Sequence, residues 1–183
     1  MNYLGIDPAK GKHQALACVS YSGDLVDFCA IKMSGNVLKD CYEIDGMTND
    51  FLVSTGEDFK AVVESQEIYK GQANKQKSII KLANYAGMIT QAVGSSHMCD
   101  SIEYVLPKDW TNREKKANQY WICKRLGFSD EDIRTTKDYS VPKVLLGEKR
   151  VTILADVLDA IGLAFWLYDK DKKDRRRREI LGK

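Results

Sequence analysis

The stretch Tyr3-Leu4-Gly5-Ile6-Asp7-Pro8 decides the fold, because it is a short apolar run that ends in one carboxylate. An apolar run of this length predicts a central strand buried on both faces of a sheet. Pro8 keeps the residue before it extended and removes one ladder hydrogen bond, so we expect the strand to end there. A carboxylate leaving a buried sheet loses hydration, at a cost on the order of several kcal/mol unless a cation or hydrogen-bond donors meet it. Asp7 is therefore the first candidate site residue.

Three further acids could share this site. Glu64 ends the apolar run Ala61-Val62-Val63, which repeats the pattern of the first strand. The segment 151–168 has a helical, almost wholly apolar pattern, and its charged side chains are Asp156 and Asp159. Helix positions three residues apart share one face, so these two acids project toward whatever the helix packs on. If that is the sheet edge carrying the strand-end acids, four carboxylates converge.

Such a cluster favours a divalent cation. Like charges in a half-buried site repel and raise one another's pKa unless a metal compensates. Hard oxygen ligands that leave space for water and phosphate suit Mg²⁺, for which Mn²⁺ can substitute. Two such ions about 4 Å apart catalyse phosphoryl transfer with water. The residues alone leave two alternatives to a metal site open. In one, Asp7 serves as a turn residue; in the other, Asp156 and Asp159 form ion pairs with lysines.

Turn residues and apolar periodicity predict the other elements. We expect strands over 14–21 and 25–31, a short helix from 37 ending at Asp45-Gly46, a helix over 75–93, a strand over 101–106 and a basic helix over 112–126. One domain, 1–168, is expected, followed by a basic tail, 169–183, that contains Arg175-Arg176-Arg177-Arg178 and that we expect to be mobile.

Charge and composition limit the kinds of partner that the protein is expected to bind. The net charge is +2, but basic residues gather at 70–81, 108–125 and 170–183. That distribution permits a polyanionic partner, although solvated faces explain each run as well. No apolar run approaches the ~18 residues of a membrane span, so no membrane partner is expected. The absence of a signal peptide and the five cysteines without CxxC spacing predict reduced thiols and a cytoplasmic location.

The ordered motifs resemble the RuvC-type Holliday-junction resolvases, nucleases of the RNase H-like superfamily. The resemblance spans about residues 3–168 and rests on Leu4-Gly5-Ile6-Asp7-Pro8, on Val62-Val63-Glu64-Ser65-Gln66 with Asn74-Lys75-Gln76-Lys77-Ser78, and on 156–164. It implies an α/β, RNase H-like fold with a five-stranded mixed sheet flanked by helices. The insertion around 32–60 and the Arg-rich tail depart from the family pattern and resemble a divergent phage-encoded member, located in the cytoplasm of a prokaryotic or phage-infected host cell.

The resemblance also implies roles for particular residues. Asp7, Glu64, Asp156 and Asp159 would be the catalytic metal ligands, holding two ions per active site. The helix at 75–93 would join a homodimer. Tyr69 is the nearest match to the aromatic residue that the family uses at the junction centre, but its offset from the glutamate is longer than the family pattern.

Lysines that follow the two acid-bearing strands would surround the entrance to the candidate site and contact DNA phosphates without recognising the bases. They are Lys10, Lys12, Lys70, Lys75 and Lys77. Trp110 and Trp121, interleaved with cations, are compatible with a nucleic-acid stripe, but we expect Trp121 to lie in the core and the lysines to face solvent.

Together these inferences predict a metal-dependent, structure-selective endodeoxyribonuclease that resolves four-way DNA junctions by two-metal hydrolysis. One alternative keeps the fold and changes the substrate, giving an RNase H-type or flap nuclease. Another is a junction-binding protein that has lost catalysis.

Overall fold

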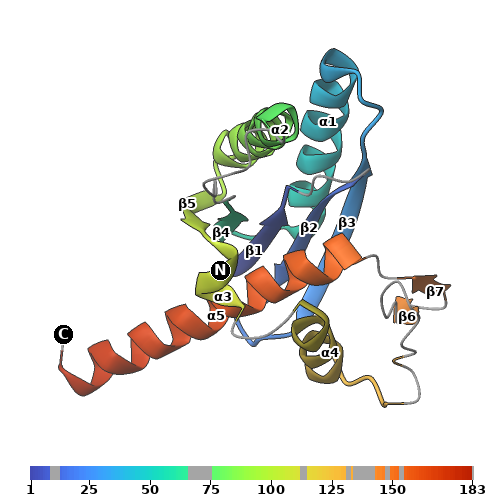
Figure 1. Cartoon of the computed structure of the whole chain (residues 1–183). Coiled ribbons are helices and arrows are strands. Elements are labelled where there is room, and N and C mark those ends of the chain that lie inside the picture. The colour runs from blue at the N-terminus through green and yellow to red at the C-terminus, as the bar shows by residue number, and fades with distance from the viewer. Residues whose placement is uncertain are drawn as a thin grey trace.

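The computed structural model of the chain describes residues 1–8, 13–65, 76–111, 115–130, 133, 143–146, 149–152 and 155–182, with backbone alone at 76–78, 115–117, 143–146 and 149–152. Its centre is a five-stranded mixed sheet of order β3-β2-β1-β4-β5. The strands are β1 (Asn2–Asp7), β2 (His13–Val19), β3 (Leu25–Lys32), β4 (Phe59–Glu64) and β5 (Cys99–Val105). β1 to β3 form an antiparallel meander, and β4 and β5 continue the sheet in parallel with β1 (Figure 1). The predicted sheet is confirmed.

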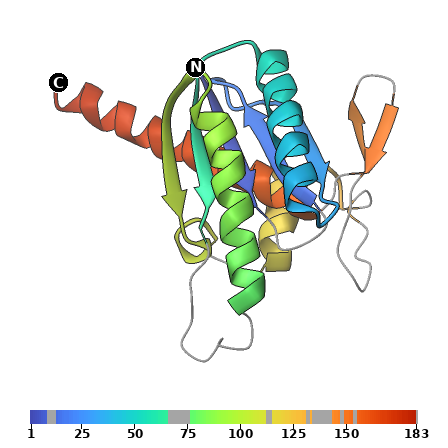
Figure 2. The same cartoon turned by 90° about the horizontal axis from the view of Figure 1, so that it is seen from above.

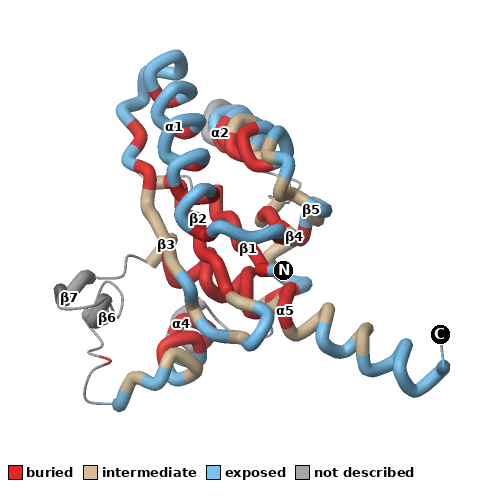
Figure 3. Tube along the Cα trace, turned by 180° about the vertical axis from the view of Figure 1, so that it is seen from behind, coloured by how far each residue is buried: buried red, intermediate tan, exposed pale blue. Residues whose placement is uncertain are grey.

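Helices cover both faces of this sheet. The main helices are α1 (Val37–Thr55), α2 (Gln76–Gly94), α4 (Lys115–Arg125) and α5 (Ala155–Ile180). α1 and α2 lie side by side over one face, and α5 with α4 covers the other (Figures 1 and 2). Each face has its own apolar core: Leu4 and Ile6 point to the α1 and α2 side, whereas Tyr3 packs with α5. Figure 3 shows the central strands β1 and β2 as buried, whereas the edge strands β3 and β5 are largely intermediate or exposed.

α1 is longer than predicted, because Gly46 does not end it. Gly46 lies in the middle of the helix, where an interior glycine costs only about 1 kcal/mol relative to alanine. Buried residues continue beyond it at helical spacing, through Thr48 and Leu52. The helix ends instead at Gly56, whose φ of 63° is the left-handed conformation of a C-terminal cap.

α5 differs from its predicted span at both ends. Its start is Ala155, because Lys149–Thr152 forms β7, which pairs with β6 (Lys143–Leu146) in a hairpin that was not predicted. The predicted end at Tyr168 is wrong, since the helix continues to Ile180 and its last turns extend beyond the sheet (Figure 1). Asp171 anchors the first part of this extension, accepting hydrogen bonds from the Tyr3 hydroxyl and the Lys60 ammonium, each at 2.8 Å.

A short helix after β5, α3 (Pro107–Trp110), was also not predicted. The predicted basic helix is α4, and Gly127 follows it with a φ of 86°, as expected for a stop. Residue 112, where this helix was predicted to begin, lies outside the described residues. No described helix combines the length and the apolar character needed to span a bilayer.

Gly5 sets how closely α5 approaches the sheet. A Cβ atom at this position would lie 2.0 Å from the carbonyl oxygen of Ala160 and 2.5 Å from the amide nitrogen of Ala164. Both are backbone atoms of α5 and cannot rotate away. Only glycine permits this contact, which holds the acid-bearing turns of α5 against β1.

Candidate active site

The two strand-end acids lie at the adjacent ends of two neighbouring strands. Asp7 is the last residue of β1, and Glu64 is the last residue of β4. These strands are parallel, and their register pairs Ile6 with Val63, so the two acids follow the last pair. Side chains alternate along a strand. Because Tyr3 and Val62 pack in the core beneath α5, the two acids point to that same face.

α5 brings the other two acids to this face. Asp156 lies in its first turn, partly exposed, and Asp159 lies one turn later with 5% of its surface exposed. Asp159 precedes Ala160, whose carbonyl oxygen rests above Gly5. Asp7 is also only 5% exposed. Two of the four carboxylates are therefore buried where the first turns of α5 cross β1.

Two of the acids have partners that sequence reasoning missed. The indole Nε1 of Trp110 donates a hydrogen bond of 2.9 Å to Oε2 of Glu64, and Nε2 of Gln119 donates one of 3.2 Å to Oδ1 of Asp159. Trp110 lies in α3 and Gln119 in α4, and the latter is 2% exposed. Hydrogen bonds to the charged form stabilise it against desolvation. These pairs lie 46 and 40 residues apart in the chain, and no local motif joins them.

The donor set suits a hard cation by its chemistry, since carboxylate oxygens are the ligands that Mg²⁺ takes from proteins. Within the described parts of the chain, however, no three His, Cys, Asp or Glu side chains are grouped closely enough to hold one metal ion. Glu64 and Asp159 each hydrogen-bond to a neutral donor in this arrangement. The structure thus brings the acids to one face, and it does not gather three of them into a ligand cluster.

The predicted DNA-contacting residues fall on segments without a described position. Lys10, Lys12, Tyr69, Lys70 and Lys75 lie outside the described residues, and Lys77 lies in α2 with its side chain outside them.

An apolar hollow of about 290 Å³ adjoins the candidate site. Glu64 and Pro8 line it on the sheet side, and Ile79 and Ala86 line it from α2. Leu82 of α2, which is 2% exposed, lines the hollow as well, so the apolar side of α2 faces both the sheet and this hollow.

Of the two tryptophans considered for a nucleic-acid stripe, Trp121 differs from its expected position. Trp121 was expected in the core, but it is 37% exposed, whereas its neighbour Ile122 is fully buried. Trp110 is 8% exposed and packs in the core beneath α5. The exposed face of α4 therefore carries an aromatic ring.

No model of a known protein family matches the chain, and no curated protein matches it in sequence. The solved structures that are similar in fold include two of RuvC. One is Thermus thermophilus RuvC in complex with Holliday junction substrate, with a TM-score of 0.63, 15% identity, and coverage of 94% of this chain and 96% of that chain. The other is the Thermus thermophilus RuvC structure, with a TM-score of 0.63, 16% identity, and coverage of 94% and 97%. The chain thus has the RuvC-like, RNase H-like fold over almost its whole length, as its motifs predicted.

Proposed function

We propose that this chain is a metal-dependent endonuclease that cuts four-way DNA junctions. One observation carries the proposal: the acids at the ends of β1 and β4 share a face of the sheet with the two acids of α5. The fold supports the choice of substrate, since the RuvC that the chain resembles was solved with a Holliday junction substrate.

Asp7, Glu64, Asp156 and Asp159 would hold two Mg²⁺ ions. Bound Mg²⁺ would supply Lewis acidity toward the scissile phosphate and toward the attacking water. The protein's own part is positioning: Trp110 and Gln119 fix two of the carboxylates through hydrogen bonds of 2.9 and 3.2 Å. Partners of this kind set the orientation and the basicity of ligand groups.

The proposed DNA contacts complete the site. Lys10 and Lys12 follow β1, and Lys70, Lys75 and Lys77 follow β4 in the chain. We propose that their ammonium groups bind phosphates around the carboxylates and so position any branched DNA irrespective of its sequence. Tyr69 would contact the unpaired centre of the junction.

The active unit that we propose is a homodimer formed through α2. Symmetric cutting of a junction needs two sites, and a two-fold axis supplies them. Ile80 of α2 is 59% exposed, and the exposed small residues Ala83 and Gly87, which border the hollow beside Glu64, follow it at helical spacing. Small residues let two helices approach closely, and an exposed isoleucine gains stability when a partner covers it.

A second candidate is a junction-binding protein without catalysis. The observation that favours it is the hydrogen bond from Trp110 to Glu64, because a partly buried carboxylate bound to an indole N–H is already stabilised without a metal.

A gel assay with labelled synthetic substrates separates these functions. Four-way junctions, three-way junctions, flaps and RNA–DNA hybrids are incubated with the protein in Mg²⁺ and in EDTA. We expect cutting of the four-way junction in Mg²⁺, with 5′-phosphate and 3′-hydroxyl products. Preferential cutting of the hybrid or the flap would replace the proposed substrate. Tight junction binding without cutting in Mg²⁺ or Mn²⁺ would establish the second candidate.

A further inference from the structure

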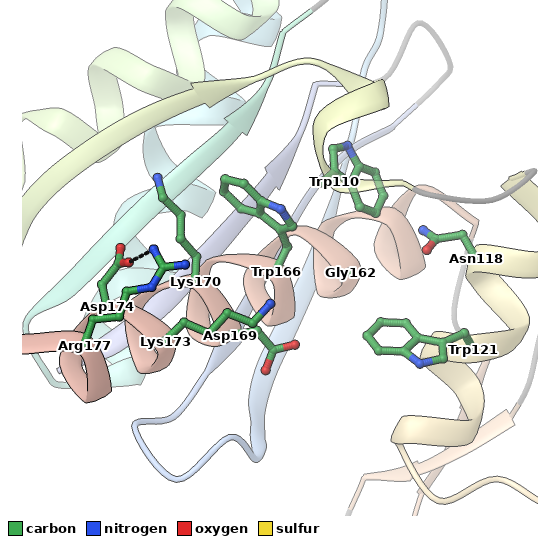
Figure 4. Close-up of a pocket in the computed structure, with 10 residues that line it drawn as sticks. All are labelled: Trp110, Asn118, Trp121, Gly162, Trp166, Asp169, Lys170, Lys173, Asp174 and Arg177. Atoms are coloured by element: carbon green, nitrogen blue, oxygen red, sulfur yellow. Dashed lines mark ion pairs between the residues drawn. The ribbon is translucent and has the colours of Figure 1, made fainter. Parts of the chain in front are cut away.

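We propose that a groove along α5, separate from the four carboxylates, binds a single-stranded DNA segment adjoining the cleavage site. This inference rests on the proposed nuclease function and extends it from branched DNA in general to an unpaired strand on a defined surface. We call this surface the tryptophan groove. It is formed where Trp110, Trp121 and Trp166 surround Gly162, and it continues along the turns of α5 that carry Lys173 and Arg177 (Figure 4).

The groove contains every tryptophan of the chain. The sequence has three tryptophans, and all three line this one hollow of about 470 Å³. They come from three separate elements, α3, α4 and α5. Packing in the core accounts for the position of Trp110, which is 8% exposed, but not for that of Trp121, which is 37% exposed. Aromatic rings that border an open hollow offer faces on which unpaired bases stack, at about 1–3 kcal/mol per base.

One end of the groove meets the candidate active site. Trp110 lines the groove, and its Nε1 also donates the 2.9 Å hydrogen bond to Glu64. Its ring lies directly against α5: a Cβ atom on Gly162 would be 2.7 Å from Cζ3 of that ring. A strand held in the groove would therefore lead to the carboxylate that Trp110 holds.

Cations border the aromatic rings. The Lys170 ammonium lies 5.2 Å from the ring centroid of Trp166, and the Arg125 guanidinium lies 5.4 Å from that of Trp121. Lys173 and Arg177, one helical turn apart, are exposed along the same side of α5. Alternation of rings with cations suits a chain whose bases stack and whose phosphates carry negative charge.

The acids of the groove are mostly neutralised within it. The Asp169 carboxylate accepts hydrogen bonds of 2.7 and 3.0 Å from both terminal nitrogens of Arg125. Asp174 lies 3.7 Å from Arg177, whose side chain is 77% exposed and can reach a phosphate as well. Lys170 is likewise paired, with the Glu103 carboxylate. The Lys173 charge is therefore the one that these pairs leave unbalanced, and it gives the groove one net positive charge.

A single strand fits these features better than a duplex does. In a duplex the base faces are stacked on one another, so tryptophan rings have no free face to meet. A protein partner would use the apolar rings but gain little from the exposed cations. The groove therefore points to unpaired nucleotides next to a branch point.

Intrinsic fluorescence tests this directly, because every tryptophan reports on the groove. The full-length protein is titrated in EDTA with a single-stranded oligo(dT) and with a duplex of equal length. We expect saturable quenching by the single strand that weakens as salt rises, and much weaker quenching by the duplex. Equal quenching by both DNAs, or none by the single strand, would overturn the proposal.

Matched charge reversals locate the binding surface on α5. K173E/R177E changes the side of the helix that lines the groove, whereas K172E/R176E makes the same change of charge on the side that borders Tyr21. All four residues are exposed, and circular dichroism checks that both variants fold. We expect K173E/R177E to weaken oligo(dT) binding at least tenfold and the control to weaken it less than threefold. Equal losses would mean that general charge, not the groove, binds the strand.

Failure of this proposal is distinguishable from failure of the proposed function. Junction cutting in Mg²⁺ without any oligo(dT)-dependent quenching would remove the groove and leave the nuclease. Quenching that depends on Lys173 and Arg177, in a protein that cuts no branched DNA, would keep the groove as a DNA-binding surface and remove the nuclease.

Discussion

At the scale of single residues, Asp40 shows how a buried charge can hold two helices together. It is 1% exposed in α1, and it accepts hydrogen bonds from the hydroxyl of Tyr85 in α2 at 2.6 Å and from the amide and hydroxyl of Ser34 at 2.6 and 2.7 Å. Burial by itself raises the pKa of Asp40, but these hydrogen bonds outweigh it and lower the pKa from 3.8 to about 2. The same contact and its burial raise the pKa of Tyr85 to about 12.

Asp40→Asn should therefore lower the free energy of unfolding by about 2–3 kcal/mol at pH 6, since hydrogen bonds to a charged group are lost. The folded-state pKa is depressed, so the contribution is complete above the ordinary value of 3.8 and is lost as the pH falls toward 2. Urea denaturation at several pH values measures this. The exposed Asp45→Asn, on the same helix, should change stability by less than about 0.5 kcal/mol. A gap between wild type and Asp40→Asn that stays constant down to pH 2 would contradict the account.

Trp110 is predicted to act as a positioning residue for Glu64. Trp110→Phe keeps an aromatic ring but removes the 2.9 Å hydrogen bond. Loss of such a partner costs about 10–100-fold in activity or metal affinity, so the rate of junction cutting should fall and its Mg²⁺ requirement should rise. Tyr120→Phe is the matched control, because it removes an aromatic hydrogen bond to an unrelated carboxylate, Asp130. An unchanged Mg²⁺ response in Trp110→Phe would show that the contact does not orient the carboxylate.

The sequence predicts the strand-end acids as candidate site residues because a carboxylate at the end of an apolar run is a local pattern. It could not identify Trp110 or Gln119, because their contacts depend on where α3 and α4 pack. It also gave Asp40 no role, since its partners Ser34 and Tyr85 meet it only when α1 lies against α2.

At the scale of elements, the contact between β1 and α5 is predicted to be the least tolerant packing in the fold. A methyl group on Gly5 would meet the Ala160 carbonyl oxygen at 2.0 Å. Gly5→Ala should lower the free energy of unfolding by about 3 kcal/mol or more, at the upper end of overpacking effects. Gly46→Ala is the control, since nothing lies within 4 Å of its Cβ position in α1, and it should stabilise by up to about 1 kcal/mol. Thermal or urea unfolding compares the two; a neutral Gly5→Ala would show that α5 can move away from β1 at little cost.

Element boundaries were predictable where the turn residues and the apolar periodicity indicated the same end. The strands and α2 fall within a few residues of their predicted ranges. The predictions failed where tertiary contacts override a local signal. α1 continues through Gly46 because its buried residues continue at helical spacing. α5 continues past Tyr168, where Asp171 accepts hydrogen bonds from Tyr3 and Lys60 of the sheet.

At the scale of the whole molecule, the proposed dimer predicts that changing one exposed side chain of α2 alters the oligomeric state. Ile80→Glu on α2 should shift the sedimenting species from dimer to monomer without unfolding it, because it places a charge where an apolar contact is proposed. Val53→Glu is the matched control, since Val53 is 74% exposed on α1, next to α2, and Ile80 is 59% exposed. Sedimentation velocity at micromolar concentration, with and without junction DNA, measures this. A wild-type protein that stays monomeric even with junction would remove the dimer.

The most direct test of the central claim is the rate of junction cutting by the four carboxylate variants Asp7→Asn, Glu64→Gln, Asp156→Asn and Asp159→Asn. Each should lose more than about a hundredfold in cutting rate at saturating Mg²⁺, because even partners of ligands cost 10–100-fold. Each should still fold and bind the junction in EDTA, and the exposed Asp50→Asn should cut normally. A variant among the four that folds and cuts the junction at a near-normal rate would contradict the assignment of its carboxylate to the catalytic metal site.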